Sequence, residues 1–151
     1  MTLDIEKLKL KTEEIVRKHN IKFVVLFGSQ AELLKSTVKK DSDFDIAVFL
    51  NSGKPLFVDF KLYGELLDEF SKLFNVKDSI KIDLTDLNRA NILLRYEIIN
   101  KGLLLYGDED EYAQFKAFAF RDYIDAKPLF DLESFLIKKR QKLIKEALIN
   151  D

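Results

Sequence analysis

Apolar residues recur along the chain with two different periods, and these periods predict where strands and helices lie. Residues 21–27 and 43–50 each contain a continuous apolar run, which is typical of a short strand with both faces buried. Residues 79–85 alternate instead, with Ile80, Ile82 and Leu84 on one face, as in a half-buried strand. Residues 103–106 predict a fourth, short buried strand.

Between these strands the apolar residues follow the helical period. Helices are expected over residues 3–19, 29–34, from Pro55 to about 74, 88–100, from about 108 to 127, and 131–148. Gly102 is a predicted left-handed cap, the acidic residues 108–111 favour a helix start, and Lys127-Pro128 predicts a helix break. The clearest helix carries a wide apolar face made of Leu56, Phe60, Tyr63, Leu67, Phe70 and Phe74.

Helices interleaved with four strands indicate an α/β (α+β) domain in which helices cover a small mixed sheet. A chain of 151 residues is long enough for one domain with a proper core. We expect the core to span residues 1–107. A C-terminal helical segment, residues 108–151, would pack on this core or on a partner, or form a homo-oligomer contact.

Composition excludes several classes of function. The formal net charge of −1 gives no global reason to bind nucleic acid or an anionic membrane. No cysteine is present, so disulfides, thiolate metal sites and a cysteine nucleophile are excluded. The charged N-terminal residues do not resemble a signal peptide, and no apolar run approaches membrane-spanning length, so a cytoplasmic location is expected.

Residues that can bind a phosphate or a metal ion lie just after the first strand and at the start of the second. Gly28 and Ser29 follow the first strand, where a residue without a β-carbon and a hydroxyl can approach a phosphate. Asp43 and Asp45 open the second strand, and their spacing of two places both carboxylates on one face. Gly-Ser is also a common strand-end turn, and Asp-x-Asp is common in solvated turns. Here the aspartates belong to a strand, and such a pair suits Mg²⁺.

A third carboxylate, Asp83, lies on the polar face of the alternating strand. If that strand pairs beside the Asp43/Asp45 strand, the three carboxylates converge. Such a cluster suits two metal ions that clamp the attacking and leaving oxygens of a phosphoryl transfer.

These residues, taken in order, resemble the nucleotidyltransferases of the DNA polymerase beta superfamily. That signature is Gly-Ser, a variable loop, Asp-x-Asp and a later aspartate, matched here by Gly28-Ser29, Asp43-Phe44-Asp45 and Asp83. The segments 82–90, 94–98, 101–106 and 121–129 further resemble the minimal nucleotidyltransferases, small proteins that act as antitoxins beside a HEPN-domain ribonuclease.

The resemblance implies a Mg²⁺-dependent transfer of AMP from ATP to a hydroxyl, that of a tyrosine, on a HEPN toxin. Asp43 and Asp45 would bridge two Mg²⁺ ions, Asp83 would ligate one of them and help to deprotonate the acceptor, and Gly28 and Ser29 would hold the pyrophosphate end. Two alternatives stay open: transfer to a small molecule, and a non-catalytic module that neutralises its partner by binding.

Two departures from the family pattern stand out. The family often continues Gly-Ser with Arg-Ala-x-Gly, whereas Gln30-Ala31-Glu32-Leu33 stands here. The following loop contains Lys35, Lys39 and Lys40, which either replace that arginine near the triphosphate or are solvated loop charges.

The single histidine and the basic run near the C-terminus are candidate functional residues, but a structural role explains each of them better. His19, the single histidine, lies on an apolar stripe and is expected to be structural. The chain is not the HEPN ribonuclease itself, because Glu14 stands where the motif Arg, four residues, His needs arginine. The basic run at residues 138–142 fits the solvent-exposed face of an amphipathic helix better than an RNA contact.

Overall fold

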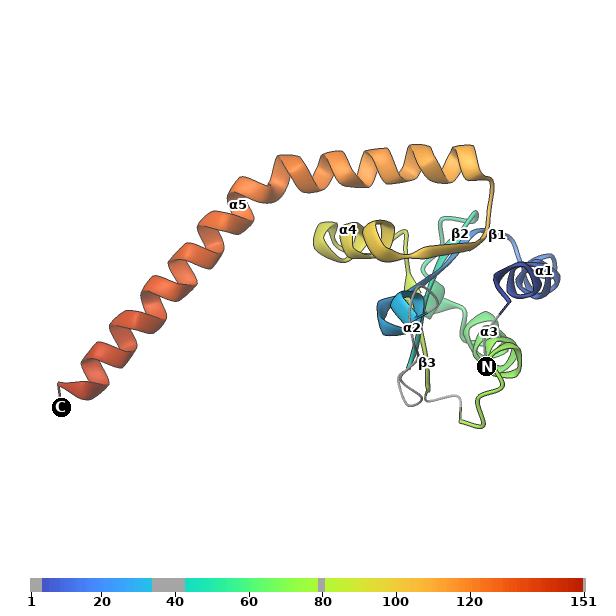
Figure 1. Cartoon of the computed structure of the whole chain (residues 1–151), viewed down its shortest axis with the longest axis horizontal. Coiled ribbons are helices and arrows are strands. Elements are labelled where there is room, and N and C mark those ends of the chain that lie inside the picture. Colours follow the sequence, from blue (N-terminus) through green and yellow to red (C-terminus); the bar gives the residue numbers. More distant parts are fainter. Residues whose placement is uncertain (1–3, 34–42, 79–80, 151) are drawn as a thin grey trace.

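A four-stranded mixed sheet forms the centre of the fold (Figure 1). The computed structural model describes residues 4–33, 43–78 and 81–150. The strands are β1 (Ile21–Phe27), β2 (Phe44–Leu50), β3 (Ile82–Asp86) and β4 (Leu103–Tyr106), in the spatial order β3-β2-β1-β4. β1 is antiparallel to β2 and to β4, whereas β2 and β3 are parallel. The predicted α/β (α+β) class is confirmed.

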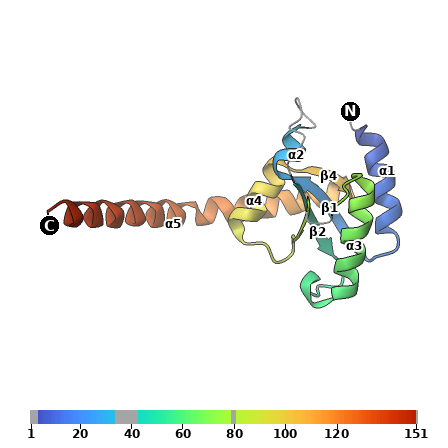
Figure 2. The same ribbon diagram turned by 90° about the horizontal axis from the view of Figure 1, so that it is seen from below.

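Helices cover both faces of this sheet. They are α1 (Ile5–Val16), α2 (Gly28–Leu33), α3 (Phe60–Leu73), α4 (Ile92–Lys101) and α5 (Glu109–Ile149), with a 3-10 turn at Leu56–Val58. α1 and α3 lie on one side of the sheet, and α4 with the first half of α5 on the other (Figures 1 and 2). No helix in the described part of the chain has both the length and the apolar character needed to cross a bilayer.

Two hydrophobic clusters result, one on each face, and β1 contributes to both. Val24 and Leu26 belong to the cluster beneath α1 and α3, whereas Phe23 and Val25 face Tyr112 of α5. Because side chains alternate along a strand, a strand buried on both faces must be apolar throughout. This explains the continuous apolar run at residues 23–27, whereas Lys22 near the start of the strand is only partly buried.

Most helices begin at a side-chain cap. Asp4, Asp59, Asn91 and Asp108 each accept a hydrogen bond from a backbone N–H two or three residues further on, at 2.9–3.1 Å. Such a cap satisfies an N–H that has no partner within the helix. The predicted helix start at the acidic residues 108–111 is therefore confirmed.

Several predicted boundaries differ from the structure. α1 ends at Val16 rather than near residue 19, and α4 begins at Ile92, after its Asn91 cap, rather than near residue 88. Pro55 precedes the 3-10 turn, and α3 starts only at Phe60. Gly102 is extended (φ −71°, ψ 154°) rather than left-handed, because the chain passes directly from α4 into β4. The start of the predicted strand 79–85 and the predicted loop lysines lie outside the described residues.

The predicted break at Lys127-Pro128 is wrong, because α5 is one helix of 41 residues with Pro128 inside it. Proline lacks an N–H and its ring crowds the carbonyl four residues earlier, which can bend a helix without ending it. Figure 1 shows α5 crossing the domain, bending part-way along, and then leaving it. Residues 131–149 are exposed throughout.

Candidate functional site

The predicted site residues come together at one edge of the sheet. β1 ends there at Phe27, opposite Asp45 near the start of the antiparallel β2. β3 starts at the same edge, since it is parallel to β2, and its Asp83 is in register with Asp45. Asp83 was expected to join Asp43 and Asp45 if its strand paired beside theirs, and β3 does pair with β2. Asp43 precedes the first residue of β2.

Asp45 is the most perturbed carboxyl group of this edge. It is half-buried, whereas Asp43 and Asp83 are exposed. Burial, followed by the negative charges of Asp83 and Asp43, raises the pKa of Asp45 above its ordinary value. A raised carboxyl pKa in a cluster of like charges marks a position where a cation would be stabilising.

Gly28 lies directly against this carboxylate. It has a positive φ of +70°, and a β-carbon at this position would collide with the Asp45 oxygen Oδ2. Both facts require glycine, because other residues rarely adopt this backbone region. Ser29 follows as the second residue of the short helix α2 and is exposed. The structure therefore places Gly28 and Ser29 beside the aspartates, at the edge where the sequence predicts them.

The donor set suits a divalent ion even though it is not a preformed cage. No three His, Cys, Asp or Glu side chains within the described ranges are grouped closely enough to hold a metal ion. Nevertheless Asp45 and Asp83 are neighbours on adjacent strands, and the negative charge of Asp83 contributes to the raised pKa of Asp45. Oxygen ligands of this kind are those that Mg²⁺ takes, usually together with waters and substrate phosphates.

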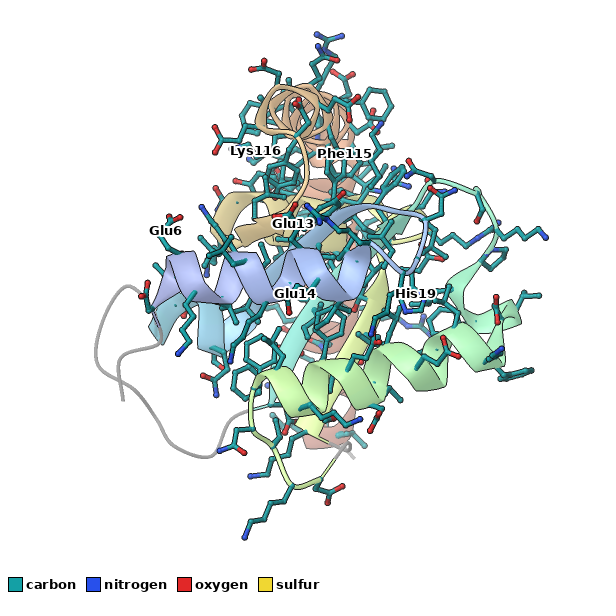
Figure 3. All side chains as sticks on the ribbon, turned by 90° about the vertical axis from the view of Figure 1, so that its right-hand side faces the viewer. Glu6, Glu13, Glu14, His19, Phe115 and Lys116 are labelled. Atoms are coloured by element: carbon teal, nitrogen blue, oxygen red, sulfur yellow. The ribbon has the colours of Figure 1, made fainter. Side chains whose placement is uncertain are left out.

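Gln30, which stands where the family often has arginine, has a buried side chain. His19 lies in the turn after α1 (Figure 3). Its Nε2 is 3.3 Å from Oε2 of Glu69 on α3. This contact ties α1 to α3, in agreement with the predicted structural role. The basic run at residues 138–142 is exposed on α5.

Sequence reasoning missed one carboxylate, Asp86, at the end of β3. It is 4% exposed, and its two oxygens accept hydrogen bonds from the backbone N–H groups of Leu56 (3.0 Å) and Asn88 (3.1 Å). It therefore fixes the 3-10 turn and the segment before α4 to the sheet. Asp86 shares the buried strand face with Ile82 and Leu84, and a carboxylate on that face is the signal that identifies it.

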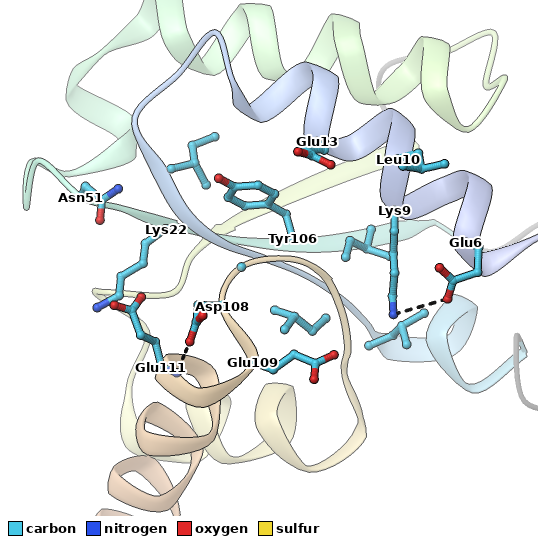
Figure 4. Close-up of a pocket in the computed structure, with 15 residues that line it drawn as sticks. Glu6, Lys9, Leu10, Glu13, Lys22, Asn51, Tyr106, Asp108, Glu109 and Glu111 are labelled. Carbon is cyan, nitrogen blue, oxygen red and sulfur yellow. Dashed lines mark hydrogen bonds and ion pairs between the residues drawn. The ribbon is translucent and has the colours of Figure 1, made fainter.

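A groove of about 680 Å³ lies along the opposite border of the sheet, beside β4 (Figure 4). It contains none of the five predicted site residues. Tyr106 and Lys22 line it together with α1, and its acidic side chains are Glu6, Glu13, Asp108, Glu109 and Glu111. The candidate site is thus distinct from this groove.

A comparison with protein families matches the region that contains these site residues. The family model described as polymerase beta, nucleotidyltransferase, matches residues 10–111, which is more than half of the chain and includes all five site residues. The chain belongs to this nucleotidyltransferase family. The family membership agrees with the order of the motif residues and with their meeting at one sheet edge.

A curated relative supports the same membership. The protein of Methanocaldococcus jannaschii named "Putative protein adenylyltransferase" is 30% identical over 101 residues, which are 67% of this chain and 97% of that protein.

Solved structures share the nucleotidyltransferase fold. One, a toxin–antitoxin with AMP-PNP, has a TM-score of 0.60 at 22% identity and covers 93% of this chain and 98% of that one. Another is the tri-AMPylated HEPN toxin of Shewanella oneidensis in complex with its MNT antitoxin. It has a TM-score of 0.56 at 20% identity and covers 95% and 98% of the two chains. At these identities the likeness establishes the fold.

Proposed function

We propose that this nucleotidyltransferase transfers AMP from ATP to a hydroxyl group, a tyrosine, of a HEPN-type ribonuclease toxin, and so acts as its antitoxin. Three similarities support the proposal. The chain belongs to the polymerase beta nucleotidyltransferase family, and a relative is named as a protein adenylyltransferase. Structures of the same fold include a complex with AMP-PNP and a complex with an AMPylated HEPN toxin.

The observation that carries the proposal is the pairing of Asp45 with Asp83 on parallel strands, beside a glycine that leaves room for the carboxylate. Two acidic side chains held next to each other destabilise a protein unless a cation is present. A binding module that only masks its partner would have no need of such a pair. This arrangement is suited to neutralising the charge of a phosphoryl transfer, which depends mainly on positioning and electrostatics.

Each residue has an assigned role. Asp43, Asp45 and Asp83 would hold Mg²⁺, which when bound neutralises the negative charge of the triphosphate. The acceptor oxygen bonds to the α-phosphorus of ATP, the bond from that phosphorus to the bridging oxygen breaks, and pyrophosphate leaves with the electron pair. The exposed Asp83 carboxylate takes the proton of the acceptor hydroxyl. Gly28 and Ser29 hold the pyrophosphate end.

The test is transfer of label from ATP to a purified HEPN toxin of the same organism. With Mg²⁺, label at the α-phosphate should appear in the toxin and label at the γ-phosphate should not. Asp45→Asn should abolish transfer, whereas Asp68→Asn, an exposed carboxylate on α3 that pairs with Lys72, should not. Transfer of γ-label, or full activity of Asp45→Asn, would overturn the assignment.

A further inference from the structure

The second half of α5 presents an apolar face that nothing in the described structure covers. Leu129, Leu136 and Leu143 are 69%, 52% and 57% exposed, and they recur every seven residues on a helix that has left the domain. A shallow groove of about 310 Å³ runs along this face between Leu129, Leu132, Glu133, Leu136, Ile137 and Arg140. Contiguous exposed apolar surface of this kind marks an interaction site.

Two opposite charges lie in the middle of the apolar face. Residues three and four positions away are the neighbours of a helical side chain. Around Glu133 these are Leu129, Phe130, Leu136 and Ile137. Around Arg140 they are Leu136, Ile137, Leu143 and Ile144. Every neighbour is apolar, so neither charge can be paired within its own helix. Neither takes part in an ion pair within the described ranges.

We propose that this face pairs with the same face of a second copy of the chain, with the two helices antiparallel. A two-fold axis requires a patch that is complementary to itself. Glu133 and Arg140 meet this requirement, because the axis would pass between Leu136 and Ile137 and bring Glu133 of each copy to Arg140 of the other. The same register brings Leu129 to Ile144, which continues the apolar contact on both sides.

The positions of Glu133 and Arg140 favour an antiparallel second copy over a parallel copy or an unrelated partner. A parallel pair would place Glu133 against Glu133 and Arg140 against Arg140, and like charges in apolar surroundings are destabilising. An unrelated partner would have to supply an acidic and a basic group at the matching separation, whereas a second copy already carries both. The side of the helix facing away carries the basic residues Lys138, Lys142 and Lys145 together with the ion pair between Lys127 and Asp131, and would stay in water. The inference is independent of the proposed transfer reaction.

Charge reversals test the pairing on the full chain in the absence of any toxin, with the mass measured by sedimentation equilibrium. The wild-type protein should be a dimer. Glu133→Arg and Arg140→Glu should each raise the dissociation constant at least tenfold, because each places like charges in contact. The matched control Lys138→Glu, a reversal on the basic side of the same helix, should leave the dissociation constant unchanged.

Recombination of the variants tests the antiparallel register. A 1:1 mixture of Glu133→Arg and Arg140→Glu, and the doubly reversed chain, should both recover the dimer. All substituted side chains are exposed, so the domain should stay folded, with unchanged far-ultraviolet circular dichroism. A wild-type protein that stays monomeric at high concentration overturns the proposal, and so does a dimer that Glu133→Arg does not weaken.

Discussion

The backbone of Gly28 lies so close to the Asp45 carboxylate that a β-carbon on residue 28 would overlap Oδ2. This contact joins the two halves of the motif, since Gly28 directly follows β1 and Asp45 belongs to β2. The left-handed φ of +70° at Gly28 turns the chain into α2 at this point. A single atom added at residue 28 would therefore disturb both the turn and the position of the carboxylate.

A series of glycine substitutions should separate these two effects. Gly28→Ala should abolish transfer and lower stability by more than Gly53→Ala. Gly53 also has a positive φ (+68°), but its β-carbon would meet nothing within 4 Å, so it isolates the backbone strain of about 1–2 kcal/mol. Thermal unfolding and transfer assays on both variants provide the comparison. Equal destabilisation with full activity in both would show that the Gly28–Asp45 contact is unimportant.

The raised pKa of Asp45 predicts a stability difference that depends on pH. The folded state disfavours the ionised carboxylate, so the contribution of Asp45 to stability is most favourable below the unfolded pKa of 3.8 and is lost as pH rises through the folded pKa. Asp45→Asn removes that penalty. The melting temperature of the variant should exceed that of wild type at pH 7, and the difference should shrink below pH 4. The opposite trend would mean that Asp45 is stabilised as an anion.

Asp86 should matter for stability and not for catalysis. Asp86→Ala leaves the N–H groups of Leu56 and Asn88 without their acceptor, which should reduce the free energy of unfolding by about 3 kcal/mol. Asp86→Asn should reduce the free energy of unfolding by a smaller amount, because its one remaining oxygen can still accept one of the two hydrogen bonds. The control is Asp83→Asn on the same strand, where the exposed carboxylate should be dispensable for stability and required for transfer. Denaturant unfolding of the three variants checks the ranking.

The buried hydroxyl of Tyr112 should be dispensable. It is 5% exposed and has no hydrogen-bond partner within the described ranges, and burial raises its pKa to about 12. Tyr112→Phe should therefore keep or slightly increase stability at pH 7. Because the unfolded tyrosine ionises near 10, the wild type should lose stability above pH 10, and Tyr112→Phe should lose less.

A second variant separates the ring from the hydroxyl. Tyr112→Leu removes the edge contact with Phe23, whose ring centroid is 5.4 Å away, and should destabilise the domain at every pH. Melting curves from pH 7 to 11 distinguish the two variants. Equal losses in both at pH 7 would mean that the hydroxyl has a stabilising contact.

The sequence predicted what depends on local pattern and missed what depends on tertiary contacts. The strand over residues 21–27 was predicted because a strand buried on both faces has a continuous apolar run, here residues 23–27. The meeting of Asp45 and Asp83 at one edge was expected from the alternation of side chains along their strands, and the strand pairing brings them together, while their chemical roles stay a prediction. Two predicted helix ends were wrong, because Gly102 is extended by the need to enter β4, and because Pro128 lies inside α5 without ending it.

The apolar positions of α5 illustrate the same limit. Their period correctly predicted a helix after residue 128, since periodicity depends on the residue spacing alone. Whether that face packs on the core depends on the direction in which α5 leaves the domain, which no local pattern encodes. The division into a core over residues 1–107 and a helical segment over 108–151 stays a prediction.

The 41-residue α5 also determines how the protein moves through solvent. At 1.5 Å per residue its contour is about 60 Å, whereas a compact chain of this size has a radius of gyration of about 15 Å. The particle is therefore elongated, and its frictional coefficient exceeds that of a sphere of 17.6 kDa. On a gel-filtration column even a single copy would elute early, at an apparent mass well above its own.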